Sequence, residues 1–596
     1  MIINIFAVIG VLIFVFIVGY ILLRFLIINL GYEFNKLEIL VFSVLLTIPI
    51  IYVVAIAFSG FGIKLTGLNL SIFFLVLAGI LIISTKKDIK TIKKNENENL
   101  INLPFIFVFL LTLILMVVTL YKNPLPFATD LSNHGYYIRE VFFTHTLPNF
   151  HLPVFVIGEN LIISIPSIIF NIDPLSIFPI IILFLFKMIT ILLIYLLAYK
   201  LFESKTVALL VMLTLGIFYS FGPPGTIYVY GGVIGNVIGD GLIMASLYIL
   251  YRTLYESEKY FLFFLLFFFS LVYTHTLSLL ILFFIIIFLL NLLVLFDRIN
   301  TLYKIKMLTK FLKNRYFLFT LLLLLVISFI YLPTYISKEN LEKITTEPIM
   351  ELQKQKLDIS YFKNVLGSLR FSLGILGLSM LLFSKQNKNI KIFFVSWLIP
   401  LLLLSWEKMT FIGLPQARVL NYMIYPFSIL MIYPLCYLRI YKNSKKITIF
   451  YLFIILILIV GFSLPERALE ENMPKERILN LYHASMYLKS LINENEVVLT
   501  EHQNSGFPDT WTRVFLLGGY NKVIERVYYF RYNNDPVKET WVMMTEPNSP
   551  KGLEYMQKNN VTYIIQNTQK VNSEFLKSRN FFKIYQGDTI TIFSKK

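Results

Sequence analysis

Uncharged apolar runs of about 20 residues recur along most of this 596-residue chain, and they restrict its fold more than any other feature. A run of that length matches the number of helical residues needed to cross the ~30 Å hydrocarbon core of a bilayer. Hydrocarbon offers no partners to backbone groups, and the runs are too long and continuous for barrel strands, so they must be helices. The sequence therefore predicts a polytopic α-helical membrane protein with about fourteen transmembrane helices. The predicted spans are residues 2–23, 38–58, 69–84, 103–120, 176–199, 206–221, 234–251, 260–273, 277–296, 317–335, 365–383, 392–406, 421–438 and 447–464.

The placement of Lys and Arg predicts how these helices are oriented. The loops fall into two alternating sets, one with 24 basic residues and the other with 10. Cytoplasmic loops carry the excess of Lys and Arg, so we expect the richer set in the cytoplasm and both chain termini outside it, in a plasma-membrane protein. The net charge of +18 is then a consequence of topology, and we expect no nucleic-acid partner. The richer loops are residues 24–36, 85–102, 200–205, 252–259, 297–315, 384–391 and 439–446.

Composition divides the chain into three predicted domains. Residues 1–102 contain three helices and a basic cytoplasmic linker. Residues 103–464 form a membrane core with a long outer loop at 121–175. From residue 465 to 596 the sequence mixes charged and apolar residues in short alternating segments, which favours a small extracytoplasmic α/β domain.

Four short runs supply the expected strands of that last domain. Val497–Thr500 and Val561–Gln566 are rich in β-branched residues, and a helix is expected between turns at Ser549–Asn559. Phe582–Tyr585 and Thr589–Phe593 flank Gly587 and Asp588, a pattern typical of a hairpin. Lys475–Ile492 has the pattern of an amphipathic helix.

The outer loop holds the densest group of reactive side chains. Asp130 and His134 are four residues apart, so on a helix they share one face, and Arg139 and Glu140 follow. We interpret His134, Arg139 and Glu140 as candidate substrate-binding residues. Ionisable groups at a bilayer boundary are where a transferase acting on a lipid-linked substrate would keep its base, and Asp130 is suited to deprotonating an acceptor or orienting a metal. The alternative is a juxtamembrane amphipathic helix whose polar side faces water.

Metal binding has limited support in the sequence. The only cysteine, Cys436, lies in an apolar run, which excludes an intrachain disulfide and a cysteine-based metal site. Suitable oxygen and nitrogen ligands are present in the outer loop, but they lack the spacing of a zinc motif; they are Asp130, His134, Glu140, His145 and His151. A divalent cation such as Mg²⁺ or Mn²⁺, held by Asp130 together with a substrate phosphate, fits better because such ions need few protein ligands.

Three more candidate substrate-binding residues are predicted on the outer face. His275 lies in a short turn between two helices, where it either contacts a substrate headgroup or is satisfied between the helices. Arg418, in the last outer loop, and Arg370, near the outer end of its span, are suited to binding phosphate; the alternative is an interfacial anchor.

Two further features lie within predicted spans. Lys187 falls mid-span, where an ammonium group is costly, so it should have a function or a buried partner. Gly231, Gly235 and Gly239 recur every four residues, which is typical of close helix packing in lipid, and Asp240 follows them.

The order Asp130, His134 and Arg139 in an early outer loop resembles the GT-C superfamily of membrane glycosyltransferases, which includes oligosaccharyltransferase catalytic subunits and protein O-mannosyltransferases. The resemblance implies that Asp130 is the catalytic or metal-orienting carboxylate. It also implies a polyprenyl-phosphate-linked sugar as donor, with Arg418 as a phosphate contact, and a glycan, lipid or protein of the cell envelope as acceptor.

The sequence departs from that family in two ways. No WWDYG motif follows in the C-terminal domain, which disfavours an oligosaccharyltransferase. Three helices precede the outer loop, whereas the family places it after the first helix, so residues 1–102 are interpreted as an added unit. The leading hypothesis is a GT-C-type glycosyltransferase. A transporter or lipid flippase, or a non-catalytic envelope scaffold, is the alternative.

Overall fold

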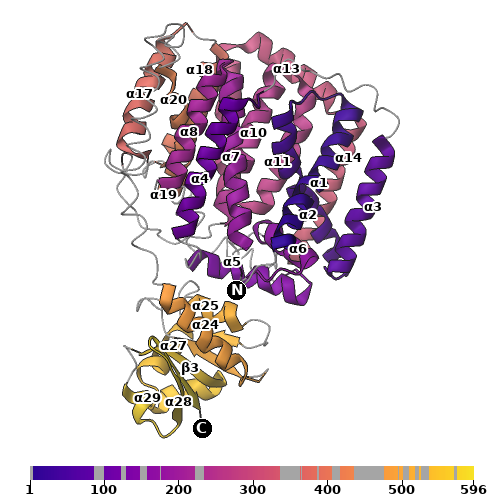
Figure 1. Ribbon diagram of the computed structural model, residues 1–596. Coiled ribbons are helices and arrows are strands. Elements are labelled where there is room, and N and C mark those ends of the chain that lie inside the picture. Colours follow the sequence, from indigo (N-terminus) through magenta and orange to yellow (C-terminus); the bar gives the residue numbers. More distant parts are fainter. Residues whose placement is uncertain are drawn as a thin grey trace. The chain divides into compact units, whose positions relative to one another are not determined.

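The chain folds into two compact units in a computed structural model (Figure 1). The helical unit comprises Met1–Pro124, Thr146–Val229 and Val233–Leu469, and the sheet unit comprises Leu125–His145, Tyr230–Gly232 and Glu470–Lys596. The three predicted domain boundaries stay predictions. The structure describes residues 5–85, 100–122, 129–147, 157–221 except 175 and 177, 234–335, 363, 366–405 except 386 and 387, 416–434, 475–493, 496–500, 509–516, 522–524, 536–568 and 573–595.

The helical unit is built from long apolar helices that coincide with the predicted spans. Seven of the described helices are long and apolar enough to cross a membrane, and an eighth span results if the pair Thr301–Phe311 and Arg315–Tyr331, bent by 77°, is counted as one. The polytopic helical class is confirmed. The count of fourteen stays a prediction, because span 447–464 lies outside the described residues, and so do residues 435–438 of span 421–438.

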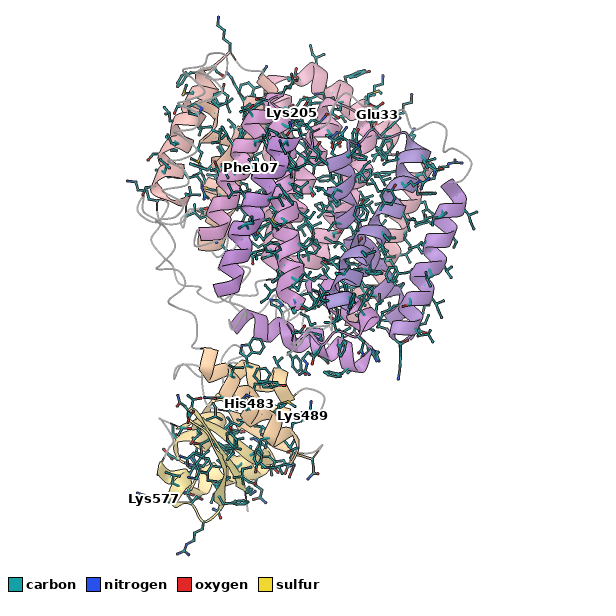
Figure 2. The ribbon with its side chains drawn as sticks, in the orientation of Figure 1. Glu33, Phe107, Lys205, His483, Lys489 and Lys577 are labelled. Atoms are coloured by element: carbon teal, nitrogen blue, oxygen red, sulfur yellow. The ribbon has the colours of Figure 1, made fainter. Side chains whose placement is uncertain are left out.

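The helices and their bounds are α1 Ile5–Leu30, α2 Lys36–Gly60, α3 Gly67–Thr85, α4 Leu103–Lys122, α6 Gly158–Phe170, α7 Phe178–Phe202, α8 Lys205–Phe221, α10 Ile234–Tyr255, η2 Glu258–Tyr260, α11 Phe261–Thr274, α12 Thr276–Phe296, α13 Arg298–Phe311, α14 Arg315–Tyr335, α17 Ser368–Phe383, α18 Lys388–Ser405, α19 Gln416–Asn421 and α20 Ile424–Leu430. Apolar side chains occupy both the interior and the outer surface of this bundle, as expected for helices in lipid. Phe107 on α4, for example, is 67% exposed (Figure 2).

Glycines allow neighbouring helices to approach closely. A methyl group on Gly19 of α1 would lie 1.7 Å from the carbonyl oxygen of Ser43 in α2, and one on Gly377 of α17 would lie 1.8 Å from that of Leu430 in α20. These helices therefore touch backbone to backbone, which is the usual way in which membrane helices pack without a hydrophobic driving force between them.

A network of charged side chains links α10 to the start of α2 at one end of the bundle. The Arg252 guanidinium on α10 contacts the carboxylates of Glu38 on α2 at 2.7 Å and of Glu256 at 2.6 Å, and it donates to the carbonyl of Glu33. Glu38 also completes a capping box with Asn35 at the start of α2. Glu33 and Lys205 lie at this same end, and α6 lies at the other (Figures 1 and 2). Loops that were predicted to share the cytoplasmic face thus share one end of the bundle.

The sheet unit has a mixed five-stranded sheet in the order β2-β1-β3-β5-β4. Strands β1, β2 and β3 are parallel, and β5 is antiparallel to both β3 and β4. Its elements are α5 Thr129–Thr144, α24 Lys475–Lys489, β1 Val497–Thr500, α25 Asp509–Leu516, β2 Lys522–Ile524, α27 Pro536–Thr545, α28 Pro550–Lys558, β3 Val561–Asn567, α29 Ser573–Lys577, β4 Phe581–Gln586 and β5 Ile590–Lys595.

The elements predicted for this region are confirmed. The strands at 497 and 561, the terminal hairpin and the helices α24 and α28 lie where the sequence placed them. Ser549 caps α28 by accepting a hydrogen bond from the Gly552 amide at 3.0 Å, with Pro550 in the first turn. Leu499, Ile564 and Phe593 from the three central strands meet in one buried cluster. Figure 2 shows His483 and Lys489 on α24.

Candidate functional site

The outer-loop motif forms a helix. Asp130 is the second residue of α5, and His134 follows one turn later on the same side of the helix. The His134 side chain is 8% exposed, while the side chain of Asp130 lies outside the described residues. The helix ends at Thr144, and His145 adopts a φ of 56° directly after it. His151 lies outside the described residues.

Arg139 fixes α5 within the sheet unit. Its Nη1 donates a hydrogen bond to the carbonyl of Val514 in α25, and its guanidinium lies 4.8 Å from the ring centre of Phe143. Gly135, one turn earlier, faces the same valine, because a methyl group there would lie 3.7 Å from Val514 Cγ1. A buried charge held in this way can align the helix that carries Asp130. The predicted substrate contacts of Arg139 and of the half-buried Glu140 stay predictions.

His275 is engaged at the start of α12. Its Nδ1 accepts a hydrogen bond from the Ser278 amide at 3.2 Å and lies 2.7 Å from Ser278 Oγ, which in turn lies 2.7 Å from the Tyr422 hydroxyl. A backbone amide can only donate, so Nδ1 is the acceptor nitrogen and a neutral imidazole carries its proton on Nε2. Of the two roles that the sequence left open for His275, the hydrogen bonds at Nδ1 support satisfaction between helices, and contact with a substrate headgroup stays a prediction.

Glu159 is a candidate that sequence reasoning missed. A methyl group on Gly235 of α10 would lie 2.2 Å from Glu159 Oε2 and 2.9 Å from His275 Cδ2, so the carboxylate and the imidazole pack against the same glycine. Glu159 is 4% exposed, and the only charged residue of α6. A single carboxylate in an apolar helix is the signal that could have revealed it.

The same contacts test the glycine pattern. A methyl group on Gly239 would lie 2.4 Å from Ser278 Oγ. Close packing at Gly235 and Gly239 is therefore confirmed, whereas Gly231 lies outside the described residues.

The two predicted arginines lie on separate helices. Arg370 is buried in the first turn of α17, and Arg418 is exposed on α19. Tyr422, whose hydroxyl lies 2.7 Å from Ser278 Oγ, follows Arg418 by four residues and comes directly after α19. The predicted phosphate contacts of Arg370 and Arg418 stay predictions.

Lys187 has the buried partner that its position required. Its ammonium nitrogen lies 2.6 Å from Asp240 Oδ2, and the two side chains are 0% and 6% exposed. The pair joins α7 to α10 inside the bundle.

Among the residues that the structure describes, no group of three or more His, Cys, Asp or Glu side chains is placed to hold a metal ion. The predicted divalent cation stays a prediction.

Comparison with known proteins adds evidence from the fold. No protein-family model matches the chain, and no curated protein matches it in sequence. The apo oligosaccharyltransferase of Archaeoglobus fulgidus has a similar structure, with a TM-score of 0.52 and 12% identity over 83% of this chain and 74% of that one. The archaeal oligosaccharyltransferase AglB from the same organism, in complex with an inhibitory peptide and a dolichol-phosphate, gives 0.52 and 13% over 78% and 69%. The chain shares the fold of an archaeal oligosaccharyltransferase.

A third structure agrees. The A. fulgidus oligosaccharyltransferase tethered to an acceptor peptide containing the NVT sequon gives a TM-score of 0.51 and 14% identity over 83% of this chain and 74% of that one. The GT-C-like fold that Asp130, His134 and Arg139 suggested is confirmed. At these identities the likeness concerns the fold, so the roles of individual residues stay predictions.

Proposed function

We propose that this protein is an integral-membrane glycosyltransferase that moves a sugar from a polyprenyl-phosphate-linked donor to an acceptor outside the cytoplasm. The observation that carries the proposal is the shared fold, since one solved neighbour binds a dolichol-phosphate and another holds an acceptor peptide. The helix α5, with Asp130 and His134 on one face, provides the candidate carboxylate.

The chemistry needs few groups. The bond between the anomeric carbon of the sugar and the donor phosphate oxygen breaks, and that carbon bonds to an acceptor oxygen or nitrogen. Asp130 takes the proton that the acceptor loses, and the bonding electron pair stays on the lipid phosphate. Arg418 and Arg370 are the candidates to balance that phosphate charge. A bound divalent cation would supply charge neutralisation there, and no step is assigned to it.

The orientation is part of the proposal. Both termini, Asp130 and the sheet unit would face away from the cytoplasm, because the alternating loops on the other side of the predicted spans carry the excess of Lys and Arg. For the transporter alternative, the mid-span candidate Lys187 is paired with Asp240 in the helical unit.

Turnover of labelled polyprenyl-phosphate sugars by purified, reconstituted protein tests the proposal. Asp130→Asn should lower turnover by about 10²- to 10⁴-fold, as expected for loss of a general base. Asp173→Asn, the same change elsewhere in the outer loop, is the control and should keep wild-type turnover. Full turnover by the Asp130→Asn protein would refute the assignment. Transport of lipid or solute by a wild type that consumes no donor would favour the transporter.

A further inference from the structure

An apolar groove runs along the first helices of the helical unit. Its volume is about 430 Å³, and it is lined by four residues of α1, six of α3 and the last two of α6. Every lining residue is apolar except Ser71. Phe14 closes one wall, with ring centres 5.0 Å from Phe74 and 6.0 Å from Phe170.

The groove opens toward hydrocarbon. Both α1 and α3 meet the length and hydropathy of membrane spans, and α3 is the less buried of the two. Leu75 and Ile17, on opposite walls, are 72% and 44% exposed. The lining offers water too few hydrogen-bond partners, and an empty space of this volume would lose dispersion contacts along both helices. A hydrocarbon chain is therefore the occupant that fits.

The helix α6 connects this groove to the polar group around His275. At its first turn, Glu159 packs with His275 against Gly235. At its last, Phe170 packs against Gly10 of α1, where a methyl group would lie 2.6 Å from the phenyl ring, and the Ile168 carbonyl approaches Gly67 of α3. Eleven helical residues separate Glu159 from Phe170, a distance of about 17 Å.

We infer that the groove holds the chain of the polyprenyl-phosphate donor, and this inference rests on the proposed function for the identity of the lipid. A polyprenyl donor whose phosphate lies near His275 has a chain longer than one leaflet, which is only about 15 Å deep. Such a chain needs a path along the protein, and α6 leads from the phosphate region to the groove. A bulk phospholipid in the groove would not need its headgroup at the other end of α6, whereas a donor bound near His275 would place its chain along this helix.

Photolabelling of the full-length protein in lipid nanodiscs tests the inference. The probe is a polyprenyl phosphate without sugar that carries a diazirine in its chain, and the labelled peptides are identified by mass spectrometry. Peptides of α1, α3 and the end of α6 should be labelled, and unlabelled polyprenyl phosphate should compete while added phosphatidylcholine should not. Competition by phosphatidylcholine alone would overturn the inference, because the groove would then hold bulk lipid.

Two substitutions on α3 sharpen the test. Ala78→Trp fills the groove and should lower labelling there by at least about ten-fold. Val76→Trp, two residues away and 55% exposed outside the lining, should leave labelling unchanged. If the Ala78→Trp substitution disturbs folding, Ala78→Leu takes its place and should lower labelling by a smaller factor. Equal labelling of the Ala78 and Val76 variants would refute the groove as the site.

The readouts separate this inference from the proposed function. Labelling of the groove without any sugar transfer would support the lipid site and refute the proposed glycosyltransferase function. Sugar transfer without labelling of the groove would support the proposed function and refute the groove as the binding site of the lipid chain.

Discussion

The ammonium nitrogen of Lys187 lies 2.6 Å from Asp240 Oδ2, and both side chains are buried between α7 and α10. Two charges can remain in a low-dielectric interior when each neutralises the other, but removal of one leaves the other uncompensated. The fold therefore needs both Lys187 and Asp240, because either charge alone would be buried without a partner.

Single substitutions of this pair should be strongly destabilising. Lys187→Met and Asp240→Asn should each lower the free energy of unfolding by about 3–5 kcal/mol, whereas the double variant Lys187→Met/Asp240→Leu should recover much of the loss. Thermal unfolding of the purified variants in detergent measures this. If Lys187→Met alone matched the wild type in stability, the pair would not have the proposed structural role.

The pair also shows what the sequence could and could not predict. The cost of an ammonium group in lipid predicts that Lys187 has a partner, but Asp240 is 53 residues away, and only the packing of α7 on α10 identifies it. The contact of Arg139 with Val514, 375 residues apart, is of the same kind. Helices and strands follow from local hydrophobic patterns and were predicted well; partners depend on the tertiary arrangement.

Glu159 illustrates a different limit. The apolar run that contains it was assigned to an outer loop, so its isolated charge carried no weight, although the structure makes it a neighbour of His275. For His275 the sequence predicted the turn between two helices and left two roles open, and the hydrogen bonds to Ser278 show the capping role that the sequence alone could not.

Substitutions at His275 should separate capping from substrate binding. His275→Ala removes the side-chain acceptor for the Ser278 amide and should cost about 1 kcal/mol of stability. His275→Asn keeps an N-cap acceptor, so it should restore stability but not any contact made by Nε2. Thermal unfolding and the KM for the donor, measured on both variants, distinguish the two roles. A wild-type KM in the Asn variant would exclude a substrate contact.

Gly235 should tolerate no side chain. Its methyl group in Gly235→Ala would lie 2.2 Å from Glu159 Oε2 and 2.9 Å from His275 Cδ2, so the substitution should cost about 1–3 kcal/mol and displace both groups. The control is Gly79→Ala on α3, where nothing lies within 4 Å of the added methyl, and which should be neutral or stabilising. Unfolding midpoints in detergent compare the two. Equal stability of the two variants would show that α6 and α10 are not closely packed there.

Glu539 should make the sheet unit sensitive to acid. Lys558 Nζ lies 2.6 Å from Glu539 Oε1, and Asn559 Nδ2 lies 3.1 Å from Oε2. Burial raises the pKa of the Glu539 carboxyl, but these hydrogen bonds and the Lys558 charge outweigh burial and hold that pKa below its usual value. A lowered pKa in the folded state means that folding favours the carboxylate, so its stabilisation is present at neutral pH and is lost as the pH falls through the folded-state pKa.

Glu539→Gln should therefore weaken α27, α28 and β3 at pH 7, and the difference from wild type should shrink below about pH 4. Hydrogen exchange of the full-length protein, corrected for the intrinsic pH dependence of exchange, reports the protection of Val561–Asn567 in both proteins. Because Lys558 is 63% exposed, added salt should reduce the difference at pH 7. A difference that persists unchanged from pH 7 to pH 3 would show that the Glu539 carboxylate does not stabilise this unit.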